Sequence, residues 1–227
     1  MRRLIVIPMV HTEAEIGYDF LSEEEKKNTE LLWKQIREAI GNLDLDWKSV
    51  KLFVDGIVNA QDELEILRSS GPTAETIRML VERRGTSIMP TEDADLCSKT
   101  SELVREAFSQ SSKTKRVDLQ GEKGFKVWDS ALSMLKEVQE NTILRDKAIA
   151  HNIDTGLRND ETGILFIGSA HNVQEHLPRD IQAEPISEDV FALRELLGDH
   201  TMIEKDIEEV RAIRDSFAPP SRGPERQ

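Results

Sequence analysis

Continuous apolar runs separated by helical segments constrain the fold of this chain more than any other feature. Residues 3–10 read RLIVIPMV and residues 163–168 read GILFIG. Apolar runs rich in β-branched residues are typical of strands that are covered on both faces in a parallel sheet. Shorter runs at 50–54 and 87–89 predict two more strands, and residues 180–186 are a candidate for another. The segments between them have helical spacing of apolar side chains, so the sequence predicts an α/β fold with a mainly parallel sheet flanked by helices.

The length of 227 residues fits one domain or a domain plus an appendage, and the sequence is interpreted as a single α/β domain over residues 1–217. Residues 109–124 are polar and contain a basic run, which predicts a flexible loop. A long helical segment with one interruption is predicted over residues 125–157. Residues 218–227 are rich in proline and predict a disordered tail.

The charge balance excludes several classes of function. The chain has 30 Lys and Arg residues against 43 Asp and Glu residues, which gives a formal net charge of −13. A chain this acidic repels phosphate backbones and anionic membranes, so we expect no nucleic-acid partner and no membrane partner. No apolar stretch approaches the roughly 18 residues of a membrane span. Neither a P-loop nor Gly-x-Gly-x-x-Gly is present, so no nucleotide cofactor is expected.

Cysteine usage points to the cytoplasm. Cys97 is the one cysteine, so the chain can form no disulfide framework and no cysteine-based zinc site of its own. We expect Cys97 to be a small core residue on a helix rather than a nucleophile.

Polar side chains follow the predicted strands where each strand ends. They are His11, Glu13 and Glu15 after the first strand, Asp55 after the second, Glu92 and Asp93 after the third, and His171 after the run at 163–168. Because the carboxyl ends of parallel strands meet at one edge of a sheet, these groups are expected to lie together. Histidine and carboxylate groups bind Mn²⁺, Zn²⁺, Co²⁺ or Fe²⁺, and they equally act as general bases. A lone histidine at a strand end is more often structural, whereas the pair His11 and His171 favours a functional site.

A second anomaly lies on the long predicted helix. At about 100° per residue, Arg145, Ile149 and Asn152 share one face, with Asp146 at its edge. The stripe that should be apolar therefore carries an arginine, which needs an anion. One alternative is a structural ion pair with Asp146 or with a strand-end carboxylate. The other is an arginine that binds an acidic ligand or a substrate oxyanion. We predict that Arg145 points toward the strand ends and contacts an acid or the ligand there.

This combination resembles a known superfamily. A helix with Arg145-Asp146, followed by a strand that ends in Gly168-Ser169-Ala170-His171, is similar to the carboxyl-terminal half of the TraB/TIKI and erythromycin-esterase/ChaN-like superfamily. Members of that group are α/β proteins with one histidine motif after the first strand and a second late in the chain. TIKI-type members are regarded as metal-dependent peptidases, and erythromycin-esterase-type members are hydrolases that use a histidine as base.

The resemblance implies that His11 and His171 face each other across a site supported by Arg145, with carboxylates from Glu13 or Glu15, from Asp55 and from Glu92. The expected function is a cytoplasmic hydrolase acting on a small molecule or a peptide. Its catalytic residues would be His11, His171 and Arg145, and a divalent metal ion would be held by His11, Glu13, Asp55, Glu92 and His171. The alternative is a non-catalytic small-ligand-binding or regulatory protein on the same scaffold. The charged helices over residues 188–217 could present an apolar stripe to a second copy, forming a homo-oligomer, or pack it on their own sheet.

Overall fold

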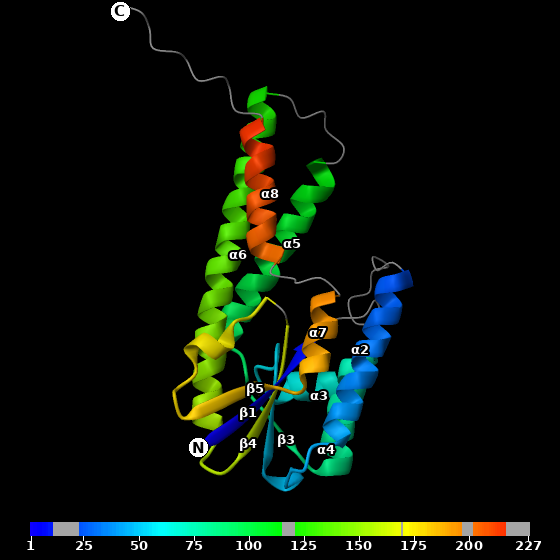
Figure 1. Cartoon of the computed structure of the whole chain (residues 1–227). Helices are drawn as coiled ribbons and strands as arrows, with labels where there is room; N and C mark the ends of the chain where they lie inside the picture. Colours follow the sequence, from blue (N-terminus) through cyan, green and yellow to red (C-terminus); the bar gives the residue numbers. More distant parts are fainter. Residues whose placement is uncertain (11–22, 115–120, 169, 197–201, 217–227) are drawn as a thin grey trace, which may run out of the picture. The chain divides into compact units, whose positions relative to one another are not determined.

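The computed structural model describes residues 1–10, 23–114, 121–168, 170–196 and 202–216 (Figure 1). The chain forms two compact units. The first unit comprises Met1–Cys97 and Leu144–His200, and the second comprises Ser98–Ile143 and Thr201–Gln227.

A five-stranded sheet forms the centre of the first unit. Its strands are β1 (Arg2–Met9), β2 (Val50–Val54), β3 (Ser87–Met89), β4 (Thr162–Gly168) and β5 (Ile181–Pro185). They lie in the order β3-β2-β4-β1-β5, and every pair of neighbours is parallel. The predicted fold class is therefore confirmed. The order also makes β3, β2 and β4 three adjacent strands, although they are far apart in the sequence.

Helices cover both faces of this sheet. The helices of the first unit are α2 (Glu23–Gly41), α3 (Ala60–Arg68), α4 (Pro72–Arg84), α7 (Glu188–Leu196) and the last turns of α6 (Gly121–Gly156). Short 3₁₀ helices lie at η1 (Trp47–Ser49) and η2 (Val173–His176). Ile5 and Ile7 of β1 pack in a core with α2, α4 and α7. Leu4 and Val6 point to the opposite face and pack with the end of α6. This alternation explains why β1 is apolar at nearly every position.

Two glycines allow α6 to approach the sheet closely. A Cβ atom on Gly163 would lie 2.7 Å from Leu4 Cδ1 on β1 and 3.4 Å from Leu157 Cδ2, directly after α6. One on Gly156 would lie 3.2 Å from the Phe53 ring. Larger side chains at these positions would push the end of α6 away from β2 and β4. The close approach matters because α6 brings polar side chains to the carboxyl ends of those strands.

Arg2 fixes the other end of the sheet to α6. Its guanidinium donates to the carbonyl oxygens of Asp154 and Leu157, at 2.6 and 3.1 Å, which satisfies acceptors at the carboxyl end of that helix. It also forms ion pairs with Asp154 at 2.6 Å and Asp180 at 2.8 Å. One buried arginine thus joins β1, the end of α6 and the turn before β5.

We expect Arg2→Met to lower the free energy of unfolding by about 1–2 kcal/mol, because two carbonyl oxygens lose their donor while the freed carboxylates still reach water. Arg3→Met is the matched control, since the Arg3 pair with Glu184 is solvent-exposed and we expect it to contribute less than about 1 kcal/mol. Urea denaturation measures both. Equal losses in the two variants would contradict the role assigned to Arg2.

Within the described residues, the second unit consists of helices. They are most of α5 (Ala94–Thr114), the first part of α6, and α8 (Met202–Ser216). Asn141 Nδ2 donates to Thr100 Oγ1 at 2.6 Å, and Arg214 pairs with Asp129 at 3.3 Å. The sequence analysis predicted one domain over residues 1–217 and did not predict that these helices form a compact unit of their own.

The predicted loop over residues 109–124 was wrong at both ends. Residues up to Thr114 belong to α5, and α6 begins at Gly121. No glycine or proline lies between residues 109 and 114, so nothing local ends α5 there. The predicted interruption of the long helix is also absent, because α6 is continuous from Gly121 to Gly156. Residues 115–120 and the predicted tail at 218–227 lie outside the described residues.

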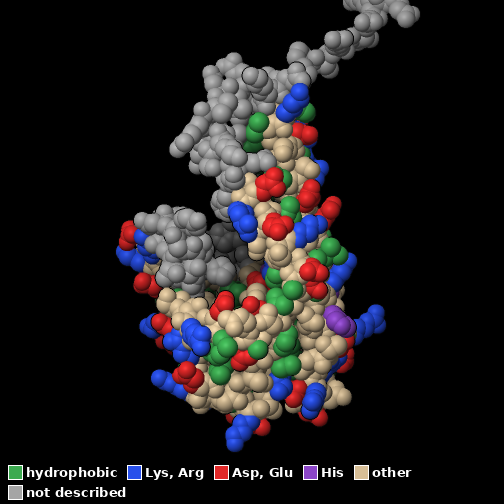
Figure 2. Space-filling model, turned by 180° about the vertical axis from the view of Figure 1, so that it is seen from behind, with side chains coloured by type: hydrophobic (Ala, Val, Ile, Leu, Met, Phe, Trp, Pro, Cys, Tyr) green, Lys and Arg blue, Asp and Glu red, His purple; other side chains and the backbone are tan. Residues whose placement is uncertain are grey.

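The mean hydropathy of the chain is −0.47, which is typical of a chain with many charged surface residues. On the face seen in Figure 2, basic and acidic side chains are interspersed with apolar ones. None of the helices within the described ranges combines the length and apolarity that a membrane span requires.

Candidate functional site

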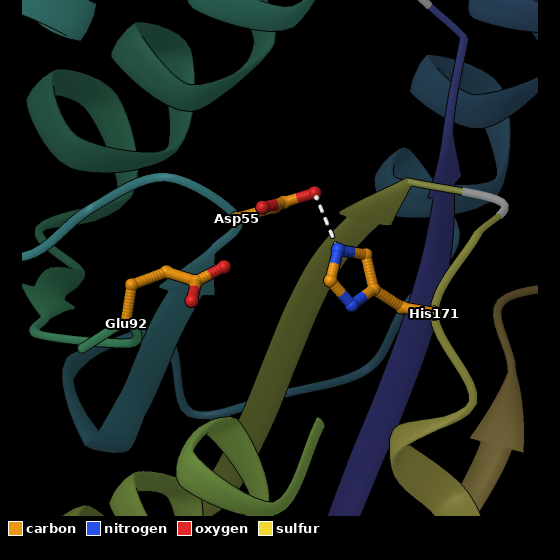
Figure 3. A group of neighbouring side chains, drawn as sticks. All are labelled: Asp55, Glu92 and His171. Atoms are coloured by element: carbon orange, nitrogen blue, oxygen red, sulfur yellow. Dashed lines mark ion pairs between the residues drawn. The ribbon is translucent and has the colours of Figure 1, made fainter. Parts of the chain in front are cut away.

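Three side chains meet beyond the carboxyl ends of adjacent strands β3, β2 and β4. They are Glu92, Asp55 and His171, each of which follows one of these strands (Figure 3). One possible ligand atom from each lies within 4.8 Å of the others. The prediction that Asp55, Glu92 and His171 lie close together is thereby confirmed.

Asp55 is held by the extension of the β2–β4 ladder. Its N–H donates to the Phe166 carbonyl at 2.9 Å, one residue beyond the end of β2. The N–H of Gly168 then donates to Asp55 Oδ2 at 3.3 Å. A Cβ atom on Gly168 would lie 3.2 Å from that same oxygen, so glycine leaves the carboxylate room to approach the backbone. Gly56 follows with φ +86°, a left-handed conformation that turns the chain away from the sheet.

Glu92 is positioned by a network around Thr91. The Thr91 hydroxyl accepts from Val54 N–H at 2.9 Å, and the N–H groups of Thr91 and Glu92 both donate to the Ile57 carbonyl, at 2.8 and 3.0 Å. Asn152 Nδ2 on α6 donates to the Thr91 carbonyl at 3.0 Å. The amide that interrupts the apolar stripe of α6 therefore fixes the segment that carries Glu92.

Arg145 binds both strand-end carboxylates. Its Nη2 donates to Asp55 Oδ1 at 2.8 Å and to Glu92 Oε1 at 2.5 Å, and its Nε donates to Glu92 Oε2 at 3.2 Å. The side chain of Arg145 is 11% exposed and that of Glu92 is 0% exposed. The predicted contact of Arg145 with the strand-end acids is confirmed, and of the two ion-pair partners considered, the strand-end carboxylates are the ones it binds.

Asp146 is the residue whose contacts the sequence did not reveal. Its Oδ1 lies 2.5 Å from His171 Nδ1, and its Oδ2 accepts from Asn172 N–H at 2.8 Å. Because an ionised carboxylate only accepts, we assign the proton to Nδ1 of His171. His171 Nε2 then faces Asp55 Oδ2 at 3.5 Å. Consecutive residues on a helix point about 100° apart, so Arg145 and Asp146 serve two sides of one cluster.

The cluster carries more negative than positive charge. Among the residues that the structure describes here, the carboxylates of Asp55, Glu92 and Asp146 stand against the guanidinium of Arg145, so two negative charges are in excess when His171 is neutral. Burial would lower the pKa of His171, but the bond to Asp146 and the charge of Asp55 outweigh it and raise that pKa. Burial also raises the pKa of Glu92, and Arg145 offsets this only in part. For Asp55, the charges of His171 and Arg145 overcome burial and lower the pKa. The cluster therefore favours added positive charge, as protons or as a cation.

The donor set fits a divalent metal ion. Two ligand atoms at about 2.1 Å from one ion lie roughly 3.0–3.4 Å apart, close to the 3.5 Å between Asp55 Oδ2 and His171 Nε2. Glu92 would be the third ligand, after releasing part of its contact with Arg145. One imidazole and two carboxylates suit Mn²⁺, Zn²⁺, Co²⁺ or Fe²⁺, and two positive charges would balance the excess.

Other residues singled out in the sequence have different places. His11, Glu13 and Glu15 lie outside the described residues. Asp93 is exposed, and its Oδ1 caps α5 by accepting from the N–H groups of Asp95 and Leu96, both at 3.0 Å.

Burial raises the pKa of the Cys97 thiol to about 12, with a further contribution from Glu92, so Cys97 is a weak nucleophile at neutral pH.

Comparison with family models, with curated proteins and with solved structures finds no match for this chain. The resemblance to the TraB/TIKI and erythromycin-esterase/ChaN-like superfamily therefore stays a prediction.

Proposed function

We propose that this chain is a hydrolase in which Asp55, Glu92 and His171 bind a divalent metal ion. The observation that carries the proposal is the orientation of His171: Asp146 holds Nδ1, and Nε2 faces the Asp55 carboxylate in a cluster with excess negative charge. A neutral imidazole with its proton on Nδ1 has a lone pair on Nε2. That lone pair repels the facing carboxylate unless a proton or a cation lies between them.

Each residue has a defined task in this proposal. A divalent ion bound here would lower the pKa of its water to about 7 and so supply hydroxide at neutral pH. Asp146 and the Gly168 N–H orient His171 and Asp55, as partners of metal ligands commonly do. Arg145 is a positioning residue, since its Nε and Nη2 are already bonded to carboxylates. His11 and Glu13 remain candidate ligands from the sequence.

The same geometry supports general-base hydrolysis without metal. His171 would accept a proton from water at Nε2 while Asp146 keeps the other proton on Nδ1 and stabilises the imidazolium. A specific observation favours a non-catalytic alternative as well. Arg145 Nε and Nη2 are bonded to Glu92 and Asp55 and so are not directed at a substrate, an arrangement that a cluster which binds a ligand without turnover would share. Metal binding and turnover must therefore be measured separately.

Calorimetric titration of chelator-treated protein with MnCl₂ and with ZnCl₂ tests the metal site. We expect one equivalent to bind, and Asp55→Asn and His171→Gln each to lose this binding. His151→Gln and Glu82→Gln are the matched controls, because both side chains are exposed on helices of the same unit. Parent protein that binds neither ion, or variants that bind as the parent does, would contradict the metal site.

Turnover is tested on p-nitrophenyl esters and on dipeptides, with and without the added ion. Hydrolysis that requires the ion and disappears in His171→Gln is the expected result. Hydrolysis that persists in chelator and still requires His171 would assign the general-base mechanism instead. Stoichiometric metal binding with no hydrolysis would favour the non-catalytic alternative.

A further inference from the structure

A cavity of about 180 Å³ adjoins the candidate site on the α6 face of the sheet. Its walls are apolar side chains of β1 and β4, among them Val6 and Ile167, closed by Val173, Leu177 and Phe191. Val6, Ile167 and Val173 are buried and belong to the core beneath the cavity.

The cavity and the candidate site share two residues. Gly168 and His171 line the cavity, and the same two residues contact Asp55 Oδ2 from the site. Among the described residues on the wall, the other polar side chains are Asn172 and Gln174, which come from the same segment after β4. A molecule that reaches His171 with a polar group can therefore extend an apolar group along β1 and β4.

We infer that this cavity receives the acyl group of the substrate, and that the substrates are esters or amides of short aliphatic or aromatic acids. The inference rests on the proposed hydrolase function. Cavities of about 150 Å³ lined by Leu, Ile and Phe bind benzene, so this volume suffices for a phenyl or short aliphatic group. The wall side chains of β1 and β4 offer no hydrogen bonds to water, which needs several polar partners to stay. A charged group would lose its hydration there without a counter-charge.

The reaction balances as an ordinary hydrolysis. The water oxygen forms a bond to the carbonyl carbon, and the bond from that carbon to the alcohol oxygen or amide nitrogen breaks. The leaving group takes up a proton from the water, and the acyl group departs as the acid. The apolar part of that acid is the part that the cavity would hold.

Binding is tested without turnover, on chelator-treated protein with methyl-labelled Leu, Ile and Val residues. The probes are ethanol, propan-1-ol, butan-1-ol and benzyl alcohol, followed by NMR, with glycerol as the polar control. We expect shifts at the methyl groups of Val6, Ile167 and Val173 but not at Leu43, which lines a separate pocket between α2 and the start of α7. Affinity should rise roughly fourfold with each buried methylene group.

A variant that fills the cavity tests whether the alcohols bind inside it. Leu177 is half-buried, so Leu177→Phe fills the cavity from its edge, and Leu43→Phe is the matched control in the other pocket. We expect Leu177→Phe to weaken benzyl alcohol binding about tenfold or more, and Leu43→Phe to leave it unchanged. Should the phenylalanine variant fail to fold, Leu177→Ala replaces it, with stronger binding of benzyl alcohol relative to ethanol expected.

Hydrolysis of p-nitrophenyl acetate, butyrate and benzoate tests the proposed hydrolase function and the acyl-binding role of the cavity separately. Preference for butyrate and benzoate over acetate, lost in Leu177→Phe, is the expected result. Probe binding in the cavity with no hydrolysis of any ester would overturn the proposed function and the acyl assignment, while the cavity would still be a binding site. Equal hydrolysis of all three esters, with no methyl shifts, would leave the function and overturn the cavity.

Discussion

Arg145→Met is expected to lower the free energy of unfolding by about 3–5 kcal/mol, the cost of removing one partner from a buried ion pair. Arg145 is the guanidinium that neutralises Asp55 and Glu92, and the Glu92 side chain is fully buried. Methionine preserves most of the volume of the arginine stem, so the loss reports the missing charge rather than a cavity. Without Arg145, Glu92 must take up a proton or remain charged without a partner.

Urea denaturation of chelator-treated protein near neutral pH measures this loss. Arg83→Met is the control, because Arg83 is exposed at the end of α4. The double variant Arg145→Met with Glu92→Gln is expected to recover part of the lost stability, since the neutral amide needs no counter-charge. A single variant as stable as the parent would show that Arg145 contributes no net stability, and it would remove the reason for treating these groups as one cluster.

The sequence could predict which edge of the sheet these residues occupy, because that edge is the same for every order of the strands. Any parallel sheet places the residues after its strands at one edge, so Asp55, Glu92 and His171 were identifiable from apolar runs alone. The order β3-β2-β4 could not be read from the sequence, yet it is this order that makes the three residues neighbours. Long-range pairing between residues 50–54 and 162–166 leaves no local signal in either segment.

The contacts of Asp146 required tertiary information. The helical repeat places Asp146 at the edge of the stripe that Arg145 interrupts, but it does not show what approaches that edge. The approach of His171 and Asn172 depends on the turn after β4. The second, helical unit was missed for a related reason. The spacing of apolar residues in α5 and α6 predicts helices with one buried face, but it does not show which helix or strand packs against that face.

The negative charge of the cluster connects its structure with its proposed chemistry. Arg145 alone leaves Asp55, Glu92 and Asp146 incompletely neutralised. Burial raises the pKa of Glu92, whereas the bond to Asp146 and the charge of Asp55 raise the pKa of His171 against the effect of burial. A purely structural ion-pair cluster is most stable when its positive and negative charges are equal in number. An excess of carboxylates next to an oriented imidazole is instead the arrangement that a cation or a catalytic proton would complete.

Asp146→Asn is expected to weaken metal binding by about 10–100-fold, the range typical of residues that orient metal ligands. Asp146 accepts two hydrogen bonds, from His171 Nδ1 and from Asn172 N–H. Asparagine has one carbonyl oxygen, so one of these two donors would face the amide NH₂ group. If that donor is His171, the ring moves its proton to Nε2 or rotates, and Nε2 no longer presents a lone pair toward Asp55.

Calorimetric titration with the metal ion that the parent binds best measures this loss, and Asp44→Asn is the isosteric control, because Asp44 is exposed in the segment after α2. The nitrogen resonances of His171 provide a readout that a purely structural role would not change. They are expected to report a proton on Nδ1 in the parent and a shift toward the Nε2 tautomer in Asp146→Asn. Unchanged affinity together with an unchanged tautomer would contradict the assignment of Asp146 as the residue that orients His171, because the repelled donor would then have found another partner at no cost to the site.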